Sequence, residues 1–384
     1  MASMSRLKKD ATGTVNLDRA DQSEWLDAAA AAARLGVSRN TLYAYVSRGR
    51  LASHPAPGST ARRYRAADVA ALAQRHAGAH TPSAAARATL DWGLPVMTSA
   101  LTLIERGRFC YRGHDVLALA DAATLEDVAA LLWADAPAEA WALVRARARQ
   151  ACGARARAGE PLHAQLARGW GLDPAGAALL RRALVLSADH ELNASSFTVR
   201  CVASTGATLE ACLGAGQAAL SGPRHGGMTM RVEALWTQWQ QSTRLEASVR
   251  RWIDDVRRTL ATRGGTPPAG ALPGFGHPLY PKGDPRARQL LACMPLDASR
   301  ERVIATVREA IGLEPALDFA LVALRRSLGL PEGAAFEIFA VARSVGWIAH
   351  ALEQRQAGAL IRPRAHYTGP RPQAAPRGRV VRVR

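Results

Sequence analysis

The sequence predicts an all-α protein in which a small helix-turn-helix domain precedes a larger helical core. Hydrophobic residues make up 48% of the 384 residues and are mostly Ala and Leu, whereas β-branched and aromatic runs are sparse. Ala and Leu favour helices, and apolar residues recur at helical spacing along most of the chain. The pattern contains no alternation of strands and helices of the kind found in α/β folds.

Composition argues against several classes of protein. No stretch approaches the roughly 20 apolar residues of a membrane span, and the N-terminus lacks the apolar core of a signal peptide. We therefore expect a cytoplasmic protein that does not enter a membrane. The five cysteines have no paired spacing, which predicts neither a disulfide framework nor a zinc cluster. Glycine-rich nucleotide fingerprints are missing, and we expect no metal site.

The formal charge of +18 favours binding to the phosphates of nucleic acid. Almost all of the cations are Arg, however, and they are spread along the whole chain. A general bias of composition toward Arg and Ala would give the same charge. Charge alone therefore leaves DNA binding open.

The first predicted elements form a helix-turn-helix within residues 23–77, after a polar and flexible lead over residues 1–22. The lead is low in apolar residues, which is typical of segments without a packed core. An Ala-rich helix is expected over residues 28–35, and Gly36 then allows a tight turn. Ser38 can cap the second helix by accepting a hydrogen bond from a backbone N–H of its first turn.

A basic wing is predicted over residues 62–65, and a further helix opens at residue 66. The segment from "AAARLGVSRNTLYAYVSRGRL" to "RRYRAADVAAL" resembles the DNA-binding domains of MerR-like and excisionase-like proteins. The resemblance implies that the second helix enters a groove of DNA while the wing grips phosphates. The alternative is a small helical domain kept for protein contacts. The residues expected to meet DNA are Ser38, Arg39, Asn40, Thr41 and Tyr43 in the helix and Arg62, Arg63 and Arg65 in the wing.

A linker containing Gly, Pro and Ser is predicted over residues 78–89, and a larger unit begins at residue 90. The first part of this unit is turn-rich and leads into an amphipathic helical pattern, in which Val116 and Leu132 are core positions. A basic tail is expected over residues 371–384. Further helices are predicted over residues 138–151, 175–186, 195–220, 245–261, 298–311 and 331–354.

Two histidines with glycine neighbours stand out in the core: His225 in Gly-Pro-Arg-His-Gly-Gly and His277 in Gly-Phe-Gly-His. The second is followed by Asp284-Pro-Arg286, while Asp189-His190 lies upstream and Asp318 downstream. Together they supply the polar groups that carbon–carbon bond formation on carboxylated substrates needs. Each residue also has a simpler explanation when it is taken alone. His225 and His277 could be loop histidines near turns, and His190 could lie on the surface of a helix. Asp318 could be a helix N-cap, and the arginines could be solvated charges.

The core resembles the citrate synthases over roughly residues 90–370. Its motifs occur in the order, and at about the spacing, seen in that family. The resemblance implies a large helical domain over residues 90–226 and 334–370, interrupted by a smaller one over residues 227–333. The motifs are "CYRGHDV", "LVLSADHELNASSFTVRCVAST", "SGPRHGG", "GFGHPLYPKGDPRARQLL", "LDFALVALRRSLGLP", "FAVARSVGWIAHALEQ" and "LIRPRAHYTGP".

The resemblance implies condensation of acetyl-CoA with oxaloacetate and water to give citrate and CoA. Asp318 would remove a proton from the methyl group of the thioester, and His225 would donate a hydrogen bond to the thioester oxygen. His277 would polarise the ketone of oxaloacetate. Acyl-CoA is then a co-substrate, and no metal or permanently bound cofactor is required.

The resemblance also assigns the binding residues. Guanidinium groups bind carboxylates through two parallel hydrogen bonds, which suits a dicarboxylate substrate. Arg362 would reach in from the partner subunit, so a homodimer with composite sites is expected, and its two domains would close over the substrates. The expected oxaloacetate ligands are His190, Arg286, Arg343 and Arg362, and the expected CoA ligands are the backbone groups of Leu272, Pro273, Gly274 and Gly276.

Three departures from the family pattern bear on specificity. Many citrate synthases have His where this chain has Ser187, and a basic residue is frequent where it has Pro278. Residues 228–230 read Met-Thr-Met instead of a polar run, on the acyl-CoA side of the site. Propionyl-CoA, which would give 2-methylcitrate, is therefore an alternative substrate. A second alternative is a DNA-binding regulator whose core senses oxaloacetate or acyl-CoA.

Overall fold

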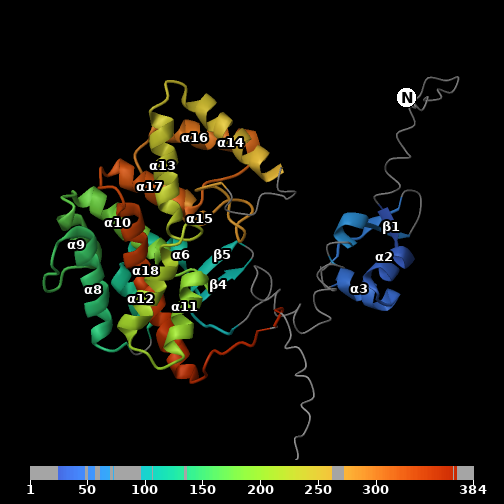
Figure 1. The fold of residues 1–384 in the computed structure, drawn as a ribbon, viewed down its shortest axis with the longest axis horizontal. Coiled ribbons are helices and arrows are strands. Elements are labelled where there is room, and N and C mark those ends of the chain that lie inside the picture. Colours follow the sequence, from blue (N-terminus) through green and yellow to red (C-terminus); the bar gives the residue numbers. More distant parts are fainter. Residues whose placement is uncertain are drawn as a thin grey trace, which may run out of the picture. The chain divides into compact units, whose positions relative to one another are not determined.

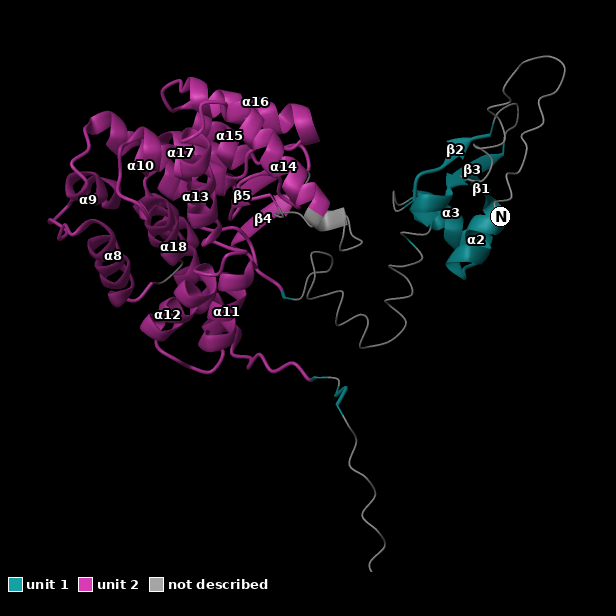
Figure 2. Cartoon of the chain, turned by 45° about the horizontal axis from the view of Figure 1, so that its top comes forward, with its two compact units in different colours: residues 1–97, 365–384 teal, residues 98–364 magenta. Residues whose placement is uncertain are grey.

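A computed structural model gives the fold. It describes residues 25–47, 51–56, 61–69, 72, 97–105, 107–133, 136–261, 272–365 and 367–369. The chain divides into two compact units, residues 98–364 and the remainder (Figure 2). The predicted lead, linker and basic tail lie outside the described residues.

The N-terminal unit is a helix-turn-helix with a three-stranded antiparallel sheet, whose strands are labelled in Figure 2. Asp27 ends the first strand and caps the helix that follows, because its Oδ1 accepts a hydrogen bond from Ala30 N at 2.7 Å. The predicted helices and wing are confirmed, whereas the strand that precedes them was not expected. The elements are β1 (Trp25–Asp27), α2 (Ala28–Leu35), α3 (Arg39–Ser47), β2 (His54–Pro55) and β3 (Arg62–Arg65), with sheet order β1-β3-β2.

The larger unit begins with a small antiparallel sheet where the sequence predicted only a turn-rich piece. Its strands are β4 (Thr102–Glu105), β5 (Arg108–Tyr111) and β6 (His114–Asp115), in the order β4-β5-β6. The helical pattern behind it divides into two helices, and Thr124 starts the second with a capping box. The helices of this unit are α6 (Val116–Ala122), α7 (Leu125–Leu132), α8 (Glu139–Cys152), α9 (Leu162–Gly169), α10 (Pro174–Ser187), α11 (Ala194–Ala203), α12 (Leu209–Leu220), α13 (Met228–Gln240), α14 (Leu245–Ala261), α15 (Pro285–Ala292), α16 (Ala298–Ile311), α17 (Leu317–Ser327) and α18 (Ala334–Ala357).

Helix α18 runs through the middle of the larger unit and carries part of the site (Figure 1). It packs against α8, α10, α11 and α12, and its residues are buried along almost its whole length. Its length and composition would suffice to cross a membrane, but 83% of its most apolar window is buried inside the unit. Burial among other helices accounts for its apolar character, because a helix that is apolar on all sides needs packing on all sides.

The sequence-based helix boundaries are confirmed in most places and wrong in one. Residues 195–220 do not form one helix, because α11 ends at Ala203 and α12 begins at Leu209. Gly206 lies between them with φ of 82°, a backbone conformation that ends a helix and that glycine adopts without strain. Helices α9, α13 and α15 were not anticipated.

Candidate active site

The loop that carries His277 is tied to the start of α17. Gly274 and Gly276 have φ of 79° and 74°, so the loop folds through two left-handed positions. Gly276 N donates to Glu314 O at 2.9 Å, and Ala316 N donates to Gly274 O at 2.8 Å. These bonds fix His277 relative to α17. They also occupy backbone groups of the loop that the sequence assigned to CoA.

Asp318 lies in the first turn of α17 and does not cap it. The N-cap is Ala316, which makes no side-chain capping bond, so the N-cap explanation of Asp318 is wrong. Among the described residues its Oδ1 is buried without a hydrogen-bond partner. Burial raises the pKa of the carboxyl group to about 7, against an opposing effect of Arg286.

Asp284 holds Arg286 in place, a partnership that the sequence analysis did not assign. Arg286 donates from Nε to Oδ1 at 2.9 Å and from Nη2 to Oδ2 at 2.7 Å, which is a bidentate ion pair. Oδ2 also accepts from Leu317 N at 3.1 Å, so the same carboxylate contacts the residue before Asp318. The signal in the sequence was Asp-Pro at a helix start, because Asp284 caps α15 and Pro285 is its first residue.

His190 and His277 lie against each other in the interior. Their ring centroids are 5.2 Å apart, and His190 Nε2 lies 2.9 Å from the hydroxyl of Tyr280. His190 is only 7% exposed, so it is not a surface histidine. Burial lowers the pKa of His277 to about 4 and takes that of His190 well below its ordinary value, and Arg286 adds to both effects. Both imidazoles are therefore neutral near pH 7.

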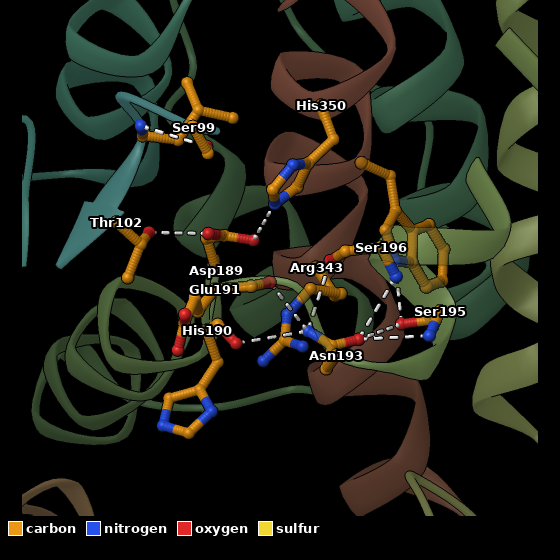
Figure 3. A network of polar contacts seen from close by, with 12 residues as sticks. Ser99, Thr102, Asp189, His190, Glu191, Asn193, Ser195, Ser196, Arg343 and His350 are labelled. Carbon is orange, nitrogen blue, oxygen red and sulfur yellow. Dashed lines mark hydrogen bonds and ion pairs between the residues drawn. The ribbon is translucent and has the colours of Figure 1, made fainter. Parts of the chain in front are cut away.

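A buried polar network supports the residue before His190 (Figure 3). Asp189 accepts from Thr102 Oγ1 at 2.5 Å, and His350 Nε2 lies 3.2 Å from its Oδ1. Arg200 Nε donates to His350 Nδ1 at 3.0 Å, so the His350 proton lies on Nε2 and is donated to Asp189. His350 and its neighbours hold the pKa of Asp189 below its ordinary value despite complete burial. The network joins β4, α11 and α18 behind His190.

His225 precedes α13 and contacts a serine of α11. Its Nε2 lies 2.9 Å from Ser195 Oγ, which also accepts from Trp347 Nε1 at 3.0 Å. Ser195 Oγ donates to Asn193 Oδ1 at 2.7 Å, and the same amide oxygen accepts the backbone N–H groups of Ser195 and Ser196 (Figure 3). Burial lowers the pKa of His225 to about 3, with a further contribution from Arg343.

Arg343 on α18 is a buried cation with an unused hydrogen-bond donor. It is 1% exposed, and its Nε donates to Ser187 O at 2.9 Å. Within the described part of the chain, its Nη2 has no hydrogen-bond partner, and neither has the buried Oγ of Ser187. Burial lowers the pKa of Arg343 to about 10. A buried cation without a paired anion favours an anionic ligand.

The structure thus brings six of the predicted residues into one region. His190 is affected electrostatically by Arg286, His277, Arg343 and His225, and Asp318 by Arg286 and Arg343. Arg362 is the exception. It is exposed beyond the end of α18, in a segment where Ile361 N donates to Ser204 Oγ at 3.1 Å. The described residues contain no cluster of His, Cys, Asp or Glu that could hold a metal ion.

The residues expected to contact DNA differ in how far their side chains are exposed. Ser38, just before α3, and Arg39, Asn40 and Tyr43 on its first half are exposed, while Leu42 is buried in the core of the N-terminal unit. Ser38 Oγ accepts from Thr41 N at 3.2 Å, which confirms its capping role.

In the wing, Arg62 and Arg65 are exposed, and Arg63 is half-buried. The guanidinium of Arg63 lies 4.3 Å from the ring centroid of Trp25, so it stabilises the sheet through a cation–π contact.

Comparisons with known proteins agree with both units. A family model, "Citrate synthase, C-terminal domain", matches residues 134–364, and a second, "Helix-turn-helix domain", matches residues 25–77. The chain is 33% identical over 199 residues to Citrate synthase 2 of Bacillus subtilis, covering 49% of this chain and 50% of that protein. It is 30% identical over 207 residues to 2-methylcitrate synthase 2 of Corynebacterium glutamicum, covering 51% of each. The chain spans about half the length of the curated relatives it matches.

Solved structures show the same fold. The citrate synthase of Thermotoga maritima superposes with a TM-score of 0.59 at 24% identity, covering 74% of this chain and 96% of that one. A Thermoplasma acidophilum citrate synthase, solved with carboxymethyl coenzyme A and oxaloacetate, gives a TM-score of 0.56 at 20% identity, covering 73% of this chain and 96% of that one. The predicted fold class is confirmed.

Proposed function

The chain belongs to the citrate synthase family, and from that premise we propose that it condenses acetyl-CoA with oxaloacetate and water to give citrate and CoA. The observation that carries the proposal is Asp318. Its buried Oδ1, which no described residue contacts through a hydrogen bond, lies in one region with two arginines and three neutral histidines. A base, two hydrogen-bond donors and two cations are what this reaction needs.

Asp318 is the base in this proposal. Its pKa of about 7 gives a carboxylate that is substantially ionised near neutral pH and is more basic than an exposed one. It removes a proton from the methyl carbon of acetyl-CoA, and the electron pair of that C–H bond moves onto the thioester as an enolate. No residue in the described part of the chain makes a hydrogen bond to Oδ1, which leaves that oxygen available to the proton.

His225 stabilises the enolate oxygen. Ser195 Oγ donates its hydrogen to Asn193 Oδ1 at 2.7 Å and lies 2.9 Å from His225 Nε2. The proposed role requires the imidazole proton on Nδ1, from which it is donated to the thioester oxygen, and the Ser195 hydroxyl then turns its hydrogen from Asn193 Oδ1 to His225 Nε2 when the thioester binds. A neutral imidazole suits this role, and the pKa of about 3 keeps it neutral.

His277 polarises the ketone of oxaloacetate. Its Nδ1 accepts from Leu279 N at 3.2 Å, so the imidazole proton lies on Nε2. Donation from Nε2 to the ketone oxygen draws electrons from the carbonyl carbon that the enolate attacks. The new C–C bond leaves an alkoxide, which the same donor stabilises and which takes up one proton to become the hydroxyl of citryl-CoA, in balance with the proton that Asp318 removed. Water then cleaves the citryl-CoA thioester and releases CoA.

The carboxylates of oxaloacetate bind to Arg286, Arg343 and His190, and Arg362 of a second subunit completes the site. Asp284 uses two donors of Arg286 and leaves its Nη1 for the substrate. Backbone groups around Leu272 and Pro273 receive part of CoA.

The acyl group of the thioester substrate is a separate question, because the relatives include both citrate and 2-methylcitrate synthases. Met228 and Thr229 are buried at the start of α13, and Thr229 Oγ1 donates back to Gly226 O at 2.8 Å. Met230 is 49% exposed. A flexible thioether at this end of the site tolerates an extra methyl group, so propionyl-CoA is the alternative thioester.

The test is CoA release with oxaloacetate plus either thioester. We expect release from the native chain and loss of at least about a thousandfold in kcat for Asp318→Asn, because the amide cannot accept the proton. Asp254→Asn, an exposed change on α14, is the matched control and should keep full activity. The preferred thioester is the one with the higher kcat/KM. No release with either thioester would overturn the proposal.

A second candidate function is DNA binding by the N-terminal unit. It is favoured by the exposure of Ser38, Arg39 and Asn40 at the start of α3, the part of a recognition helix that reads base edges.

A mobility-shift assay with genomic fragments tests this function. We expect salt-dependent binding that Arg39→Ala together with Asn40→Ala weakens by roughly tenfold or more. Arg34→Ala on the exposed side of α2 removes the same charge and should change binding little. Equal weakening by both changes, or no binding by the native chain, would contradict base reading by α3.

A further inference from the structure

Ser187 carries a buried hydroxyl that the mechanism above does not use. The residue ends α10 and is fully buried, and its Oγ has no hydrogen-bond partner among the described residues. A buried hydroxyl without a partner costs free energy in the unliganded protein. Such a group is unusual enough to require a physical explanation.

The position of Ser187 suggests that explanation. Its carbonyl oxygen accepts the Nε hydrogen of Arg343 at 2.9 Å, so the guanidinium is fixed against the same residue whose hydroxyl is unpartnered. Arg343 Nη2 is also a buried donor for which the described residues provide no partner. Neither group bonds to the other or to any other described residue, so one ligand carboxylate can accept a hydrogen bond from each.

We propose that Ser187 Oγ is an additional oxaloacetate ligand, which donates a hydrogen bond to the carboxylate bound by Arg343. This inference rests on the proposed function. A carboxylate is the appropriate ligand, because the two unpartnered groups are a cation and a hydroxyl donor, and a carboxylate accepts from both at once. Ser187 therefore recognises the oxo acid and not the acyl thioester.

The test uses Ser187→Ala and Ser187→Cys in the full-length protein. Loss of a hydrogen bond to a charged group weakens binding by roughly tenfold or more, so we expect the Ala variant to raise both the Kd and the KM for oxaloacetate by that factor. The KM for acyl-CoA should stay unchanged. Cysteine keeps the volume but is a weak donor, and it should fall between the other two.

Thermal unfolding without ligand separates a binding role from a packing role. Ser187→Ala removes an unpartnered polar group, so the unliganded Tm should stay the same or rise. Ser344→Ala is the control, because that serine is equally buried on α18 but bonds to Ala340 O at 2.8 Å. It should leave the oxaloacetate affinity unchanged. A lower Tm for Ser187→Ala with unchanged affinity would overturn the proposal.

Calorimetric titration with oxaloacetate tests the proposed function and the proposed role of Ser187 separately. Binding by the native chain without CoA release overturns the proposed function alone, and the affinities of the Ser187 variants still test the hydroxyl. Turnover with unchanged affinity in Ser187→Ala overturns the role of Ser187 alone. No binding of oxaloacetate by the native chain overturns both.

Discussion

At the scale of single residues, burial sets the protonation of the side chains proposed to do the chemistry. The same loss of hydration raises the pKa of Asp318 to about 7 and lowers those of His277 and His225 to about 4 and 3. Burial acts in opposite directions because it disfavours the charged form of both kinds of group. The site therefore combines a stronger base with two neutral hydrogen-bond donors.

These pKa values predict the pH profile. Only ionised Asp318 accepts a proton, so kcat/KM should fall roughly tenfold per pH unit below about 7 and level off above it. His277 and His225 stay neutral through this range and should add no second step. Bound oxaloacetate brings negative charge toward Asp318, so the step in kcat should lie at higher pH than that in kcat/KM. Initial rates measured across this pH range give kcat and kcat/KM. If neither quantity changed with pH, Asp318 would not be the base.

The sequence predicted which residues meet but not what holds them. His190, His225, His277, Arg286, Arg343 and Asp318 were all predicted. The contacts that support them were not, because folding of distant segments brings Tyr280 to His190, Trp347 to Ser195 and Leu317 to Asp284. The unpartnered hydroxyl of Ser187 is a property of packing that no sequence motif contains.

At the scale of elements, glycine spacing allows α12 to approach α18. A Cβ built on Gly216 would lie 2.8 Å from Cδ2 of Trp347 and 2.8 Å from Cγ2 of Val199. Trp347 donates to Ser195, the hydrogen-bond partner of His225. Packing of α12 on α18 is therefore linked to the orientation of a proposed catalytic imidazole.

Two substitutions on α12 test this packing. We expect Gly216→Ala to destabilise the protein by about 1–3 kcal/mol through overpacking, and to lower kcat by displacing Trp347. Gly214→Ala is the control, because a Cβ there meets nothing within 4 Å. It should stabilise the helix by about 0.5–1 kcal/mol. Denaturant unfolding measures the stability of both variants. Equal effects at the two positions would mean that the close approach of α12 to α18 at Gly216 does not matter for stability.

Local patterns explain which elements could be predicted. The long helices α14 and α16 match their expected bounds, because their apolar period is regular and polar caps mark the start of α16. Helix α15 has eight residues, too few for a period to stand out, and β1 has three. Strand β1 is defined by its antiparallel pairing with β3, a contact that the local sequence does not encode.

At the scale of the whole molecule, the two units were predicted from separate resemblances, and both are confirmed by family matches. How the two units would work together in one protein depends on whether two chains form a dimer. Six of the proposed site residues lie in one region of a single chain, whereas Arg362 is exposed on the segment that follows α18. Two-fold symmetry would supply each site with the Arg362 of the partner subunit and would place two copies of α3 for a palindromic DNA site.

Mixing two inactive variants tests the composite site. Asp318→Asn removes the proposed base, and Arg362→Ala removes the residue proposed to cross the interface. In a mixed dimer, one site would carry both defects and the other neither, since its Asp318 and Arg362 come from different chains. Random exchange makes half of the dimers mixed, so co-refolding should restore about a quarter of native activity.

The outcome distinguishes the possible positions of Arg362. If it acted within its own chain, every site in the mixture would keep one defect and activity would stay absent. If it took no part, the Arg362→Ala variant would be active before mixing. Arg364→Ala, two residues further along the same exposed segment, is the control and should be active alone. Recovery near one quarter requires a dimer whose sites are shared, because only exchange of chains can unite the two intact residues.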